Sequence, residues 1–532
     1  MSSSTLTTTA KSMTFAPEPI VRLVNAFQEP YNLAVATART CYSSRVIEPD
    51  DVDRDEAAKL QRDRIAESIY KAGHHTTIQH PTFQFVLERV SRQFIWSFLH
   101  AHPFYNSEQV SQRYVEVKPE HFSIPPIDEP ARAIYLEAIN LQMDAYHRLI
   151  ELVEPTVVQE YRRLFPSRDL SEKRWSSSIK KRCQEVARYV LPVATHAHLY
   201  HTISGITLHR YWRLCEQPDV PLEQRLVVQR MVEAVAKIDP KFMELAQDPM
   251  PLEETPEYQL FEAFHQPSIN GSGREFLDEF DQRLGGYTSR LIDYKVHGQE
   301  TMAQAVRSVL GLSRDRLPDE DAISLVLDPS RNPYLSDALT LTTMSKLSRA
   351  MVHPHFTFQK KLSHTADSQD QRHRMVPASR PILAGQFVSD RPDYITPALI
   401  LETPSALECY TTIMTSVWRA IDQLLNLGAS HEFALYLLPN AFPIRFEESG
   451  DLLHFHHKWV QRLCYTAQEE IWHACRDEVL QISAHVPEIG RYLRAPCWVR
   501  SQAQTRPYCP EGDRFCGVAV WKLPIEEYHR LI

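Results

Sequence analysis

The chain has 532 residues, of which 23% are charged and 43% are apolar, and its formal net charge at pH 7 is −9. Because a single hydrophobic core rarely grows this large, we expect two or more domains. The composition is typical of a globular protein and excludes disordered and collagen-like classes, and the acidic balance excludes a broadly basic face for nucleic acid. A small-molecule partner is expected instead.

The N-terminus predicts a flexible tail at residues 1–19. Its sequence, MSSSTLTTTAKSMTF, lacks the apolar core of a signal peptide, and no window reaches the roughly 18 apolar residues that span a bilayer. The nine cysteines are scattered and odd in number, which is typical of a reducing compartment. These features predict a cytoplasmic protein without a membrane segment.

Three stretches illustrate the expected secondary structure. Residues 55–73, DEAAKLQRDRIAESIYKAG, predict an amphipathic helix that ends at Gly73. Residues 82–90, TFQFVLERV, alternate apolar and polar side chains, as a half-buried strand does. Residues 405–428 place apolar side chains at three- and four-residue steps and stop at Gly428. The predicted class is α+β, helix-rich with small sheets.

Several short motifs occur twice in the same order. Arg22-Leu23 matches Arg290-Leu291 at an offset of 268, and HPTFQF from His80 matches HPHFTF from His353 at an offset of 273. ARYVLP, ending at Pro192, answers ALYLLP, 247 residues later. This order predicts a tandem duplication, with the drift in offset absorbed by loops. The expected domains are a tail at 1–19, copy one at 20–250, a Pro-rich acidic linker at 251–283, copy two at 284–496 and a cysteine-containing segment at 497–532.

Polar stretches in both copies are candidates for binding an anion. In YNSEQVSQRYVEV, Ser111 and Arg113 can converge on one phosphate if the backbone turns, although the same pattern fits a capped surface loop. Arg188 precedes Leu-Pro and fits either a ligand contact or a surface ion pair. Arg372-His373-Arg374 puts two guanidiniums and a titratable ring in one turn, which also fits a solvated basic loop.

Metal and nucleotide motifs are largely missing. No glycine-rich phosphate loop occurs. Two clusters of three histidines occur, and neither has the H-E-x-x-H pattern. A metal-dependent hydrolase is therefore a minor alternative. The C-terminal cysteines Cys497, Cys509 and Cys516 are either free thiols or, with a histidine, ligands of a structural zinc. The histidine clusters comprise His196, His198 and His201, and His454, His456 and His457.

Taken together, these pieces resemble the flavin-dependent thymidylate synthases. In copy one the resemblance runs through ARTCYSS, GHHTTIQHPTFQFVLERVSRQF, SEQVSQRYV, ARYVLP and RLCEQ, and in copy two through HPHFTF, RHR, LLHF and RLCYTAQEEIW. The family signature, Arg-His-Arg, seven residues, then Ser and Arg-Tyr, is divided here. Copy one keeps Ser111, Arg113 and Tyr114 but reads LHAHP, spanning 99–103, in place of the triplet. Copy two keeps the triplet but has Ile382 where Ser should fall.

The resemblance implies a tetramer whose sites lie between subunits, with each subunit giving one part of the signature. The losses are complementary, because Ser97 replaces a glutamine in copy one and Leu435 replaces the equivalent of Arg188 in copy two. We therefore expect one composite site between the copies, with two chains pairing as a pseudo-tetramer. Copy two matches one side with Gln369, Arg372, His373, Arg374 and Arg462, and copy one matches the other with Ser111, Arg113 and Arg188.

The activity implied is reductive methylation of dUMP to dTMP with methylenetetrahydrofolate, NADPH and FAD, and without a metal. One departure bears on the flavin, because Ser204-Gly205-Ile206 and Glu448-Ser449-Gly450 replace the family's Asn-x-Arg. An inactive nucleotide-binding paralogue is therefore the alternative. The resemblance implies catalytic roles for Arg372 and Arg462; dUMP contacts from Ser111, Arg113, Arg188, Gln369, Arg372 and Arg462; and FAD contacts from Arg372, His373, Arg374, Thr76, Glu108 and His454.

Overall fold

The computed structural model describes residues 14–100, 104–245, 251–264 and 272–532. The chain forms two compact units that interleave along the sequence. Because the second unit takes a segment of copy one and the first takes a segment of copy two, each unit is built from both copies. Unit 1 comprises Met1–Asn140, Pro192–Ile269 and Ala420–Leu438, and unit 2 comprises Leu141–Leu191, Asn270–Arg419 and Pro439–Ile532.

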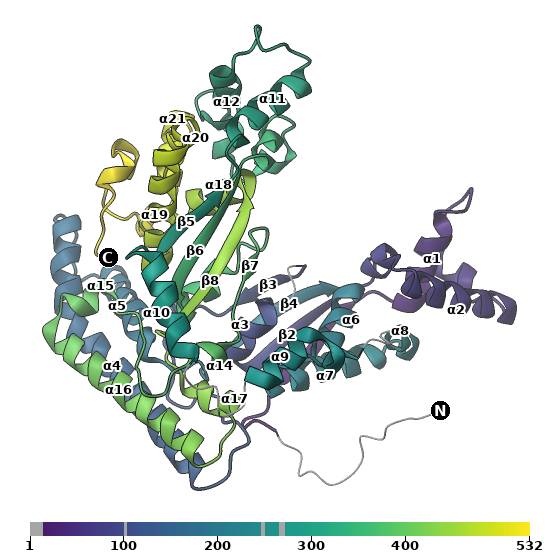
Figure 1. Cartoon of the computed structure of the whole chain (residues 1–532), viewed down its shortest axis with the longest axis horizontal. Helices are drawn as coiled ribbons and strands as arrows, with labels where there is room; N and C mark the ends of the chain where they lie inside the picture. The colour runs from purple at the N-terminus through teal and green to yellow at the C-terminus, as the bar shows by residue number, and fades with distance from the viewer. Residues whose placement is uncertain (1–13, 101–103, 246–250, 265–271) are drawn as a thin grey trace. The chain divides into compact units, whose positions relative to one another are not determined.

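Unit 1 contains a four-stranded antiparallel sheet in the order β1-β2-β4-β3. Phe83, Phe85 and Leu87 on the central strand β2 are fully buried, which follows from the alternating pattern of its sequence. Figure 1 shows α6 and α7 beside this sheet. The strands are β1 (Ile20–Ala26), β2 (Thr82–Ser91), β3 (Asn106–Gln109) and β4 (His196–Ser204).

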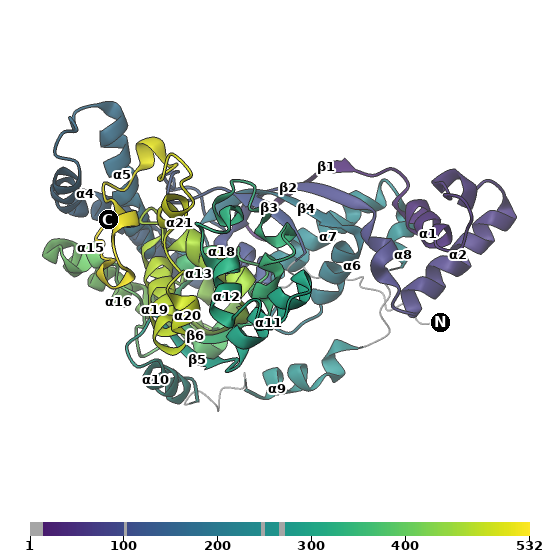
Figure 2. The same ribbon diagram turned by 90° about the horizontal axis from the view of Figure 1, so that it is seen from above.

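Helices complete unit 1. Figure 2 shows α1 and α2 side by side, where the Tyr31 hydroxyl donates to Asp63 at 3.1 Å and Arg62 donates to Asn32 at 2.9 Å. The helices are α1 (Pro30–Thr40), α2 (Glu56–Lys71), α3 (Arg92–His100), α6 (Gly205–Leu214), α7 (Leu222–Ala236), α8 (Pro240–Glu244), α9 (Pro256–Phe264) and α17 (His431–Ala434). Two longer helices, α4 (Ala131–Leu164) and α16 (Pro404–Asn426), contribute residues to both units.

Unit 2 repeats this sheet in the order β5-β6-β8-β7. Its strands are β5 (Ser289–Tyr294), β6 (His355–Ser363), β7 (Ala378–Ser379) and β8 (Pro443–Asp451). Its helices are α5 (Lys173–Ala187), α10 (Ser272–Leu284), α11 (Gly298–Leu310), α12 (Asp319–Leu327), α13 (His364–Asp370), α14 (Leu383–Gln386), α15 (Ala398–Leu401), α18 (Leu452–Arg462), α19 (Glu469–His485), α20 (Pro487–Gly490) and α21 (Pro496–Gln502).

The structure confirms the predicted class and the three predicted elements. The helix predicted at 55–73 is α2, and Gly73 follows it with φ +73°, a conformation that favours glycine. The predicted strand is β2, and the helix predicted at 405–428 is α16, with Gly428 at φ +86° just beyond its end. No helix of the described residues is long and apolar enough to cross a membrane.

The two sheets have equivalent registers, which confirms the duplication. Arg22 pairs with Val86 in the first sheet, and Arg290 pairs with Gln359 in the second. The equivalent residues of β1 and β5 are therefore 268 apart and those of β2 and β6 are 273 apart, the same offsets as in the repeated motifs. One residue of the change in offset arises inside a strand rather than in a loop. β2 has a bulge between Glu88 and Val90 that β6 lacks, and Arg89 there adopts φ +56°.

Two predicted boundaries differ from the structure. Residues 1–13 lie outside the described residues, but Phe15 is 1% exposed and packs against Tyr436 at 5.2 Å between ring centroids, so the predicted tail is too long. The predicted linker contains α9 and α10, because apolar side chains recur at helical spacing there. Residues 246–250 and 265–271, including the start of the Gly-Ser-Gly tract, lie outside the described residues.

Candidate functional site

The Arg372-His373-Arg374 triplet follows α13 in unit 2. Ser363 begins the helix, where its hydroxyl accepts from the Ala366 amide at 3.1 Å and donates to Glu470 of α19 at 2.5 Å. Beyond the helix end, the His373 amide donates to the Asp370 carbonyl at 3.0 Å. This capped helix and the turn after it set the position of the triplet. Arg372 is exposed, and His373 and Arg374 are partly buried.

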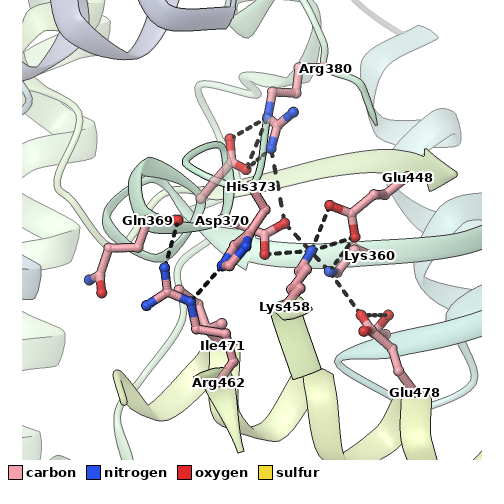
Figure 3. Close-up of polar contacts among 12 residues, drawn as sticks. Lys360, Gln369, Asp370, His373, Arg380, Glu448, Lys458, Arg462, Ile471 and Glu478 are labelled. Atoms are coloured by element: carbon pink, nitrogen blue, oxygen red, sulfur yellow. Dashed lines mark hydrogen bonds and ion pairs between the residues drawn. The ribbon is translucent and has the colours of Figure 1, made fainter. Parts of the chain in front are cut away.

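His373 and Arg462 are in direct contact. Arg462, the last residue of α18, donates from Nε to His373 Nε2 at 2.9 Å and from Nη2 to the Gln369 carbonyl at 3.4 Å (Figure 3). Burial, together with the charges of Arg462 and Lys458, lowers the pKa of His373 well below its ordinary value. In the neutral ring with its proton on Nδ1, Nε2 accepts the Arg462 hydrogen bond. The structure thus brings together three of the predicted site residues.

Beneath this pair lies a buried set of five charged side chains, here called the ionic cluster: Lys360, Asp370, Glu448, Lys458 and Glu478 (Figure 3). All five are fully buried. Lys458 Nζ lies 2.7 Å from Asp370 Oδ1 and 2.6 Å from Glu448, and Lys360 Nζ lies 2.8 Å from both Glu448 and Glu478 and 3.4 Å from Asp370. Glu478 also accepts from Ser289 at 2.8 Å and from the Trp459 indole at 2.6 Å.

The ionic cluster shifts the pKa values of its members in opposite directions. Burial opposes ionisation of Asp370, but the charges of Lys360, Lys458 and Arg380 outweigh burial and hold the pKa of Asp370 well below its ordinary value. Burial and the charge of Asp370 raise the pKa of Glu448. The lowered pKa keeps Asp370 ionised, and Asp370 is also the residue from which the triplet turn begins.

A second ion pair holds the far end of the triplet loop. Arg380 follows β7 and donates to both carboxylate oxygens of Asp367, with Nε at 3.0 Å from each and Nη2 at 2.8 Å from Oδ1. Its guanidinium lies over the Phe446 ring at 4.8 Å, and Nη2 is 4.0 Å from Asp370. The loop that carries the triplet is thus held to α13 at both of its ends.

Arg188 of copy one lies in unit 2, where it begins the 3₁₀ turn Arg188–Val190 and is 4% exposed. Its carbonyl accepts from the Asn440 side chain at 3.0 Å. The hydroxyl of the next residue, Tyr189, donates to Glu470, the carboxylate that also accepts from the Ser363 amide at 2.7 Å. Through Glu470, which contacts both Tyr189 and Ser363, the copy-one segment that carries Arg188 is linked to the start of α13, the helix that precedes the triplet.

Unit 1 contains the reciprocal exchange. Tyr436 of copy two lies in unit 1, and its hydroxyl donates to Glu223 at 2.9 Å. Glu223 accepts from the Ser91 hydroxyl at 2.5 Å, which is the equivalent of the Glu470 contact in unit 2. Leu435 precedes Tyr436 and is buried, so the place of Arg188 is apolar here. The sequence predicts the degraded triplet at 100–102 or 101–103; His100 is the last residue of α3, and residues 101–103 lie outside the described residues.

The remaining predicted site residues of copy one lie in unit 1. Ser111 follows β3, and its hydroxyl accepts from the Arg113 amide at 3.2 Å. The Arg113 guanidinium lies over the Tyr114 ring at 5.5 Å. Thr76 and Glu108 are both exposed, on a 3₁₀ turn and on β3. The two units thus divide the predicted residues, with Arg188 in the same unit as the triplet.

The histidine and cysteine clusters carry no metal site in the structure. Among the described residues, no group of three or more His, Cys, Asp or Glu side chains could hold a metal ion. His454 Nδ1 lies 2.8 Å from Asp451, the N-cap of its helix, while His196 and His198 line a cavity of about 420 Å³ in unit 1. Burial and the neighbouring thiols of Cys464, Cys516 and Cys509 raise the pKa of Cys497 to about 12. The described cysteines are all free.

Sequence reasoning missed the ionic cluster. A signal for it exists in the central strand β6, where FQKKLS places Lys360 at a position that the alternation assigns to the core. A lysine at a core position predicts a buried carboxylate partner, but the partners lie 10 to 118 residues away, so spacing does not reveal them.

Comparison with known proteins identifies the family. The model of the thymidylate synthase complementing protein family matches residues 22–241 and again residues 290–488. The two matches span most of the chain and fall one in each copy. The chain therefore belongs to the thymidylate synthase complementing protein family, as a tandem duplicate.

Individual relatives agree at modest identity. The chain is 27% identical over 223 residues to a flavin-dependent thymidylate synthase of Clostridium tetani, which covers 41% of this chain and 83% of that protein. It is 27% identical over 193 residues to one of Nitratidesulfovibrio vulgaris, covering 35% and 70%. Among solved structures, a UMP/dUMP methylase, PolB, of Streptomyces cacaoi matches 43% of this chain and 94% of its own, at 19% identity and a TM-score of 0.30.

Proposed function

We propose that the chain is a flavin-dependent thymidylate synthase that methylates dUMP to dTMP, with methylenetetrahydrofolate as carbon donor and NADPH as reductant. Its composite site takes Gln369, Arg372, His373, Arg374 and Arg462 from copy two and Ser111, Arg113 and Arg188 from copy one. The observation that carries the proposal is the exchange of segments, because Arg188 lies in the unit that holds the triplet. The losses in the two copies are also complementary, and an unrelated decay of the copies predicts no such complementarity.

The side chains divide between the two ends of dUMP. Arg113, Arg188 and Ser111 neutralise the phosphate with charge-assisted hydrogen bonds. Arg462, fixed by His373, contacts the nucleotide from α18 together with Gln369. Arg372 is exposed on its loop and polarises the uracil ring, so that charge developing on the base is stabilised. Two chains pair to give four copies.

The donor set fits a flavin dinucleotide in part. Arg372, which is exposed, and Arg374, which is partly buried, offer two guanidiniums in unit 2 that suit an anionic diphosphate. The His373 ring lies 6.1 Å from that of His457 on α18, the helix that also carries His454. Thr76 and Glu108 are exposed and can donate to and accept from a ribose or ring edge. If bound there, FAD would supply the hydride, drawn from NADPH, for reduction of the methylene-bearing base.

One observation favours the alternative, an inactive nucleotide-binding paralogue. Ser204 pairs with Thr82 and Asp451 pairs with His355, so Asp451 rather than Glu448 is the copy-two equivalent of Ser204. The family's flavin-contacting Asn-x-Arg is therefore replaced in both copies, by Ser204 with Ile206 and by Asp451 with Leu453. The alternative retains dUMP binding without FAD.

Complementation tests the proposed function. The full chain is expected to rescue a thymidine-requiring strain, and the purified protein is expected to be yellow. Arg372→Ala and Arg113→Ala should each abolish rescue and lower turnover by about 100-fold or more, since each removes a transition-state or phosphate contact. Arg148→Ala, an exposed arginine paired with Glu151, is the control and should rescue fully.

Three outcomes separate the candidates. Rescue that is lost in both site variants supports the composite thymidylate synthase. Calorimetry that shows dUMP binding by a colourless protein without rescue supports the inactive paralogue. Full rescue by Arg113→Ala would contradict a site shared between the copies.

A further inference from the structure

The positions of the ionic cluster have aromatic and apolar counterparts, with one histidine, in unit 1, and these show which of its features the fold itself requires. Leu87 pairs with Leu199 as Lys360 pairs with Phe446, and His201 pairs with Phe85 as Glu448 pairs with Phe358. The helical members also coincide. Phe98 and Asp370 are each the seventh residue of α3 and α13, Tyr211 and Lys458 the seventh of α6 and α18, and Met231 and Glu478 the tenth of α7 and α19.

The counterpart residues pack as an aromatic and apolar core. The Phe98 ring lies 4.4 Å from Tyr211 and 5.0 Å from His201, and His201 Nε2 lies 3.2 Å from the Tyr211 hydroxyl. Leu87 and Met231 are fully buried. The same sheet and helices therefore form with Leu, His, Phe, Tyr and Met at these five positions. A buried ion-pair cluster is weak evidence of a stabilising role, because well-packed apolar side chains often replace buried ion pairs without loss of stability.

What distinguishes the two units is the loop above these positions. In copy two the cluster lies under Arg372-His373-Arg374, whereas copy one has lost both arginines of the triplet. Asp370 joins the two features, because its carboxylate is held by Lys458 and Lys360 while its carbonyl accepts the His373 amide. Gln369, the preceding residue, accepts from Arg462 through its carbonyl. The charged core is thus present in the unit that holds the triplet, and its counterpart positions in the other unit are aromatic or apolar except for His201.

We propose that Asp370 is a positioning residue, and that the ionic cluster acts through it to hold His373 and Arg462 in the geometry that binds dUMP. The proposal rests on the proposed function and extends it to residues that touch no ligand. Lys458 contributes twice, since α18 carries both Lys458 and Arg462 and the Lys458–Asp370 contact ties this helix to the triplet loop. Lys360 ties the same carboxylate to the central strand β6.

The first variant is Asp370→Asn in the full chain, which keeps the shape and removes the charge. The Michaelis constant for dUMP is expected to rise about tenfold or more, because Arg462 is no longer held in place. A merely structural role lowers the fraction of folded enzyme, and hence the apparent kcat, but leaves the Michaelis constant unchanged. The matched control is Arg445→Met, which removes another buried ion pair on the same sheet, with Asp281 and Asp393, away from the triplet. Its Michaelis constant should stay within about twofold of wild type.

The second variant transplants the copy-one core into copy two, by combining Lys360→Leu, Asp370→Phe, Glu448→His, Lys458→Tyr and Glu478→Met. Because unit 1 folds around these residues, the variant is expected to keep a cooperative unfolding transition while losing dUMP affinity about tenfold or more. Unchanged dUMP affinity in this variant, or an unchanged Michaelis constant in Asp370→Asn, would overturn the proposal.

A readout independent of turnover separates failure of this proposal from failure of the proposed function. With ¹⁵N-labelled arginine, the Arg462 Nε–H donated to His373 should give a slowly exchanging resonance in wild type and in Arg445→Met. It should be lost in Asp370→Asn and in the transplant. If wild type binds no dUMP, the proposed function fails, and this resonance still decides the positioning role. A resonance that persists in both cluster variants rejects that role, whatever the protein binds.

Discussion

In the contact between Arg462 and His373, the surroundings of the ring determine which side chain donates the hydrogen bond. The ring has to stay neutral to accept from Arg462, and burial with two nearby cations keeps it so. On α18, the helix that ends at Arg462, His456 is 5% exposed, and burial together with the neighbouring His457 lowers its pKa to about 4. Neutral buried histidines make a folded protein sensitive to acid, because the unfolded chain binds protons that the folded chain cannot.

The residue-scale prediction concerns pH. The pKa of His456 is about 4 in the folded chain and 6.5 in the unfolded chain, so its effect on the free energy of unfolding is absent above pH 6.5 and grows as the pH falls below it. At pH 5 this one residue lowers stability by about 2 kcal/mol. In His456→Leu, denaturant unfolding at pH 7 and pH 5 should therefore differ by about 2 kcal/mol less than in wild type. The exposed His355→Asn should show no such change, and an identical pH dependence in His456→Leu contradicts the assignment.

At the scale of elements, the same short unit is built twice. A strand ends in a serine, the serine begins a helix, and its hydroxyl donates to a glutamate on a later helix, as Ser91 with Glu223 and Ser363 with Glu470. A tyrosine of the other copy donates to each glutamate. The architecture is conserved between the copies, whereas only the second carries the triplet at the end of its helix. Substitutions at equivalent positions of the two copies can therefore distinguish an effect on folding from an effect on ligand binding.

The element-scale prediction uses this match. Ser363→Ala and Ser91→Ala should each reduce the free energy of unfolding by about 1 to 3 kcal/mol, because each removes a helix cap and leaves a buried carboxylate short of a donor. Only Ser363→Ala should also weaken dUMP binding measured by calorimetry, since α13 ends at the triplet turn. Equal loss of dUMP affinity in both variants would argue against the assignment of the triplet loop to the site.

At the scale of the whole molecule, neither copy forms a unit by itself. Unit 2 includes Leu141–Leu191 of copy one, with Tyr189 fully buried against Glu470, and unit 1 includes Ala420–Leu438 of copy two. A contiguous copy therefore lacks part of the core that its own sheet needs. Each compact unit therefore depends on segments from both copies.

The molecule-scale prediction is that the copies do not fold apart. Residues 1–250 and 251–532, expressed separately, should be aggregated or lack a cooperative unfolding transition, because each exposes the apolar surface that the missing segment covers. Co-expression should yield a complex that purifies together and unfolds cooperatively. A cooperative unfolding transition of 251–532 alone, followed by circular dichroism, would contradict the exchange of segments.

The sequence by itself determined the duplication, the α+β class, the helices at α2 and α16 and the strand β2, because these follow from local spacing of apolar side chains and from glycines that end helices. It also revealed the divided triplet signature. Only the tertiary structure decided that Arg188 joins the unit of the triplet and that Lys360 and Lys458 share buried carboxylates beneath it. Tyr189 and Glu470 are 281 residues apart, and a contact of that separation depends on which surfaces pack together, which no local pattern encodes.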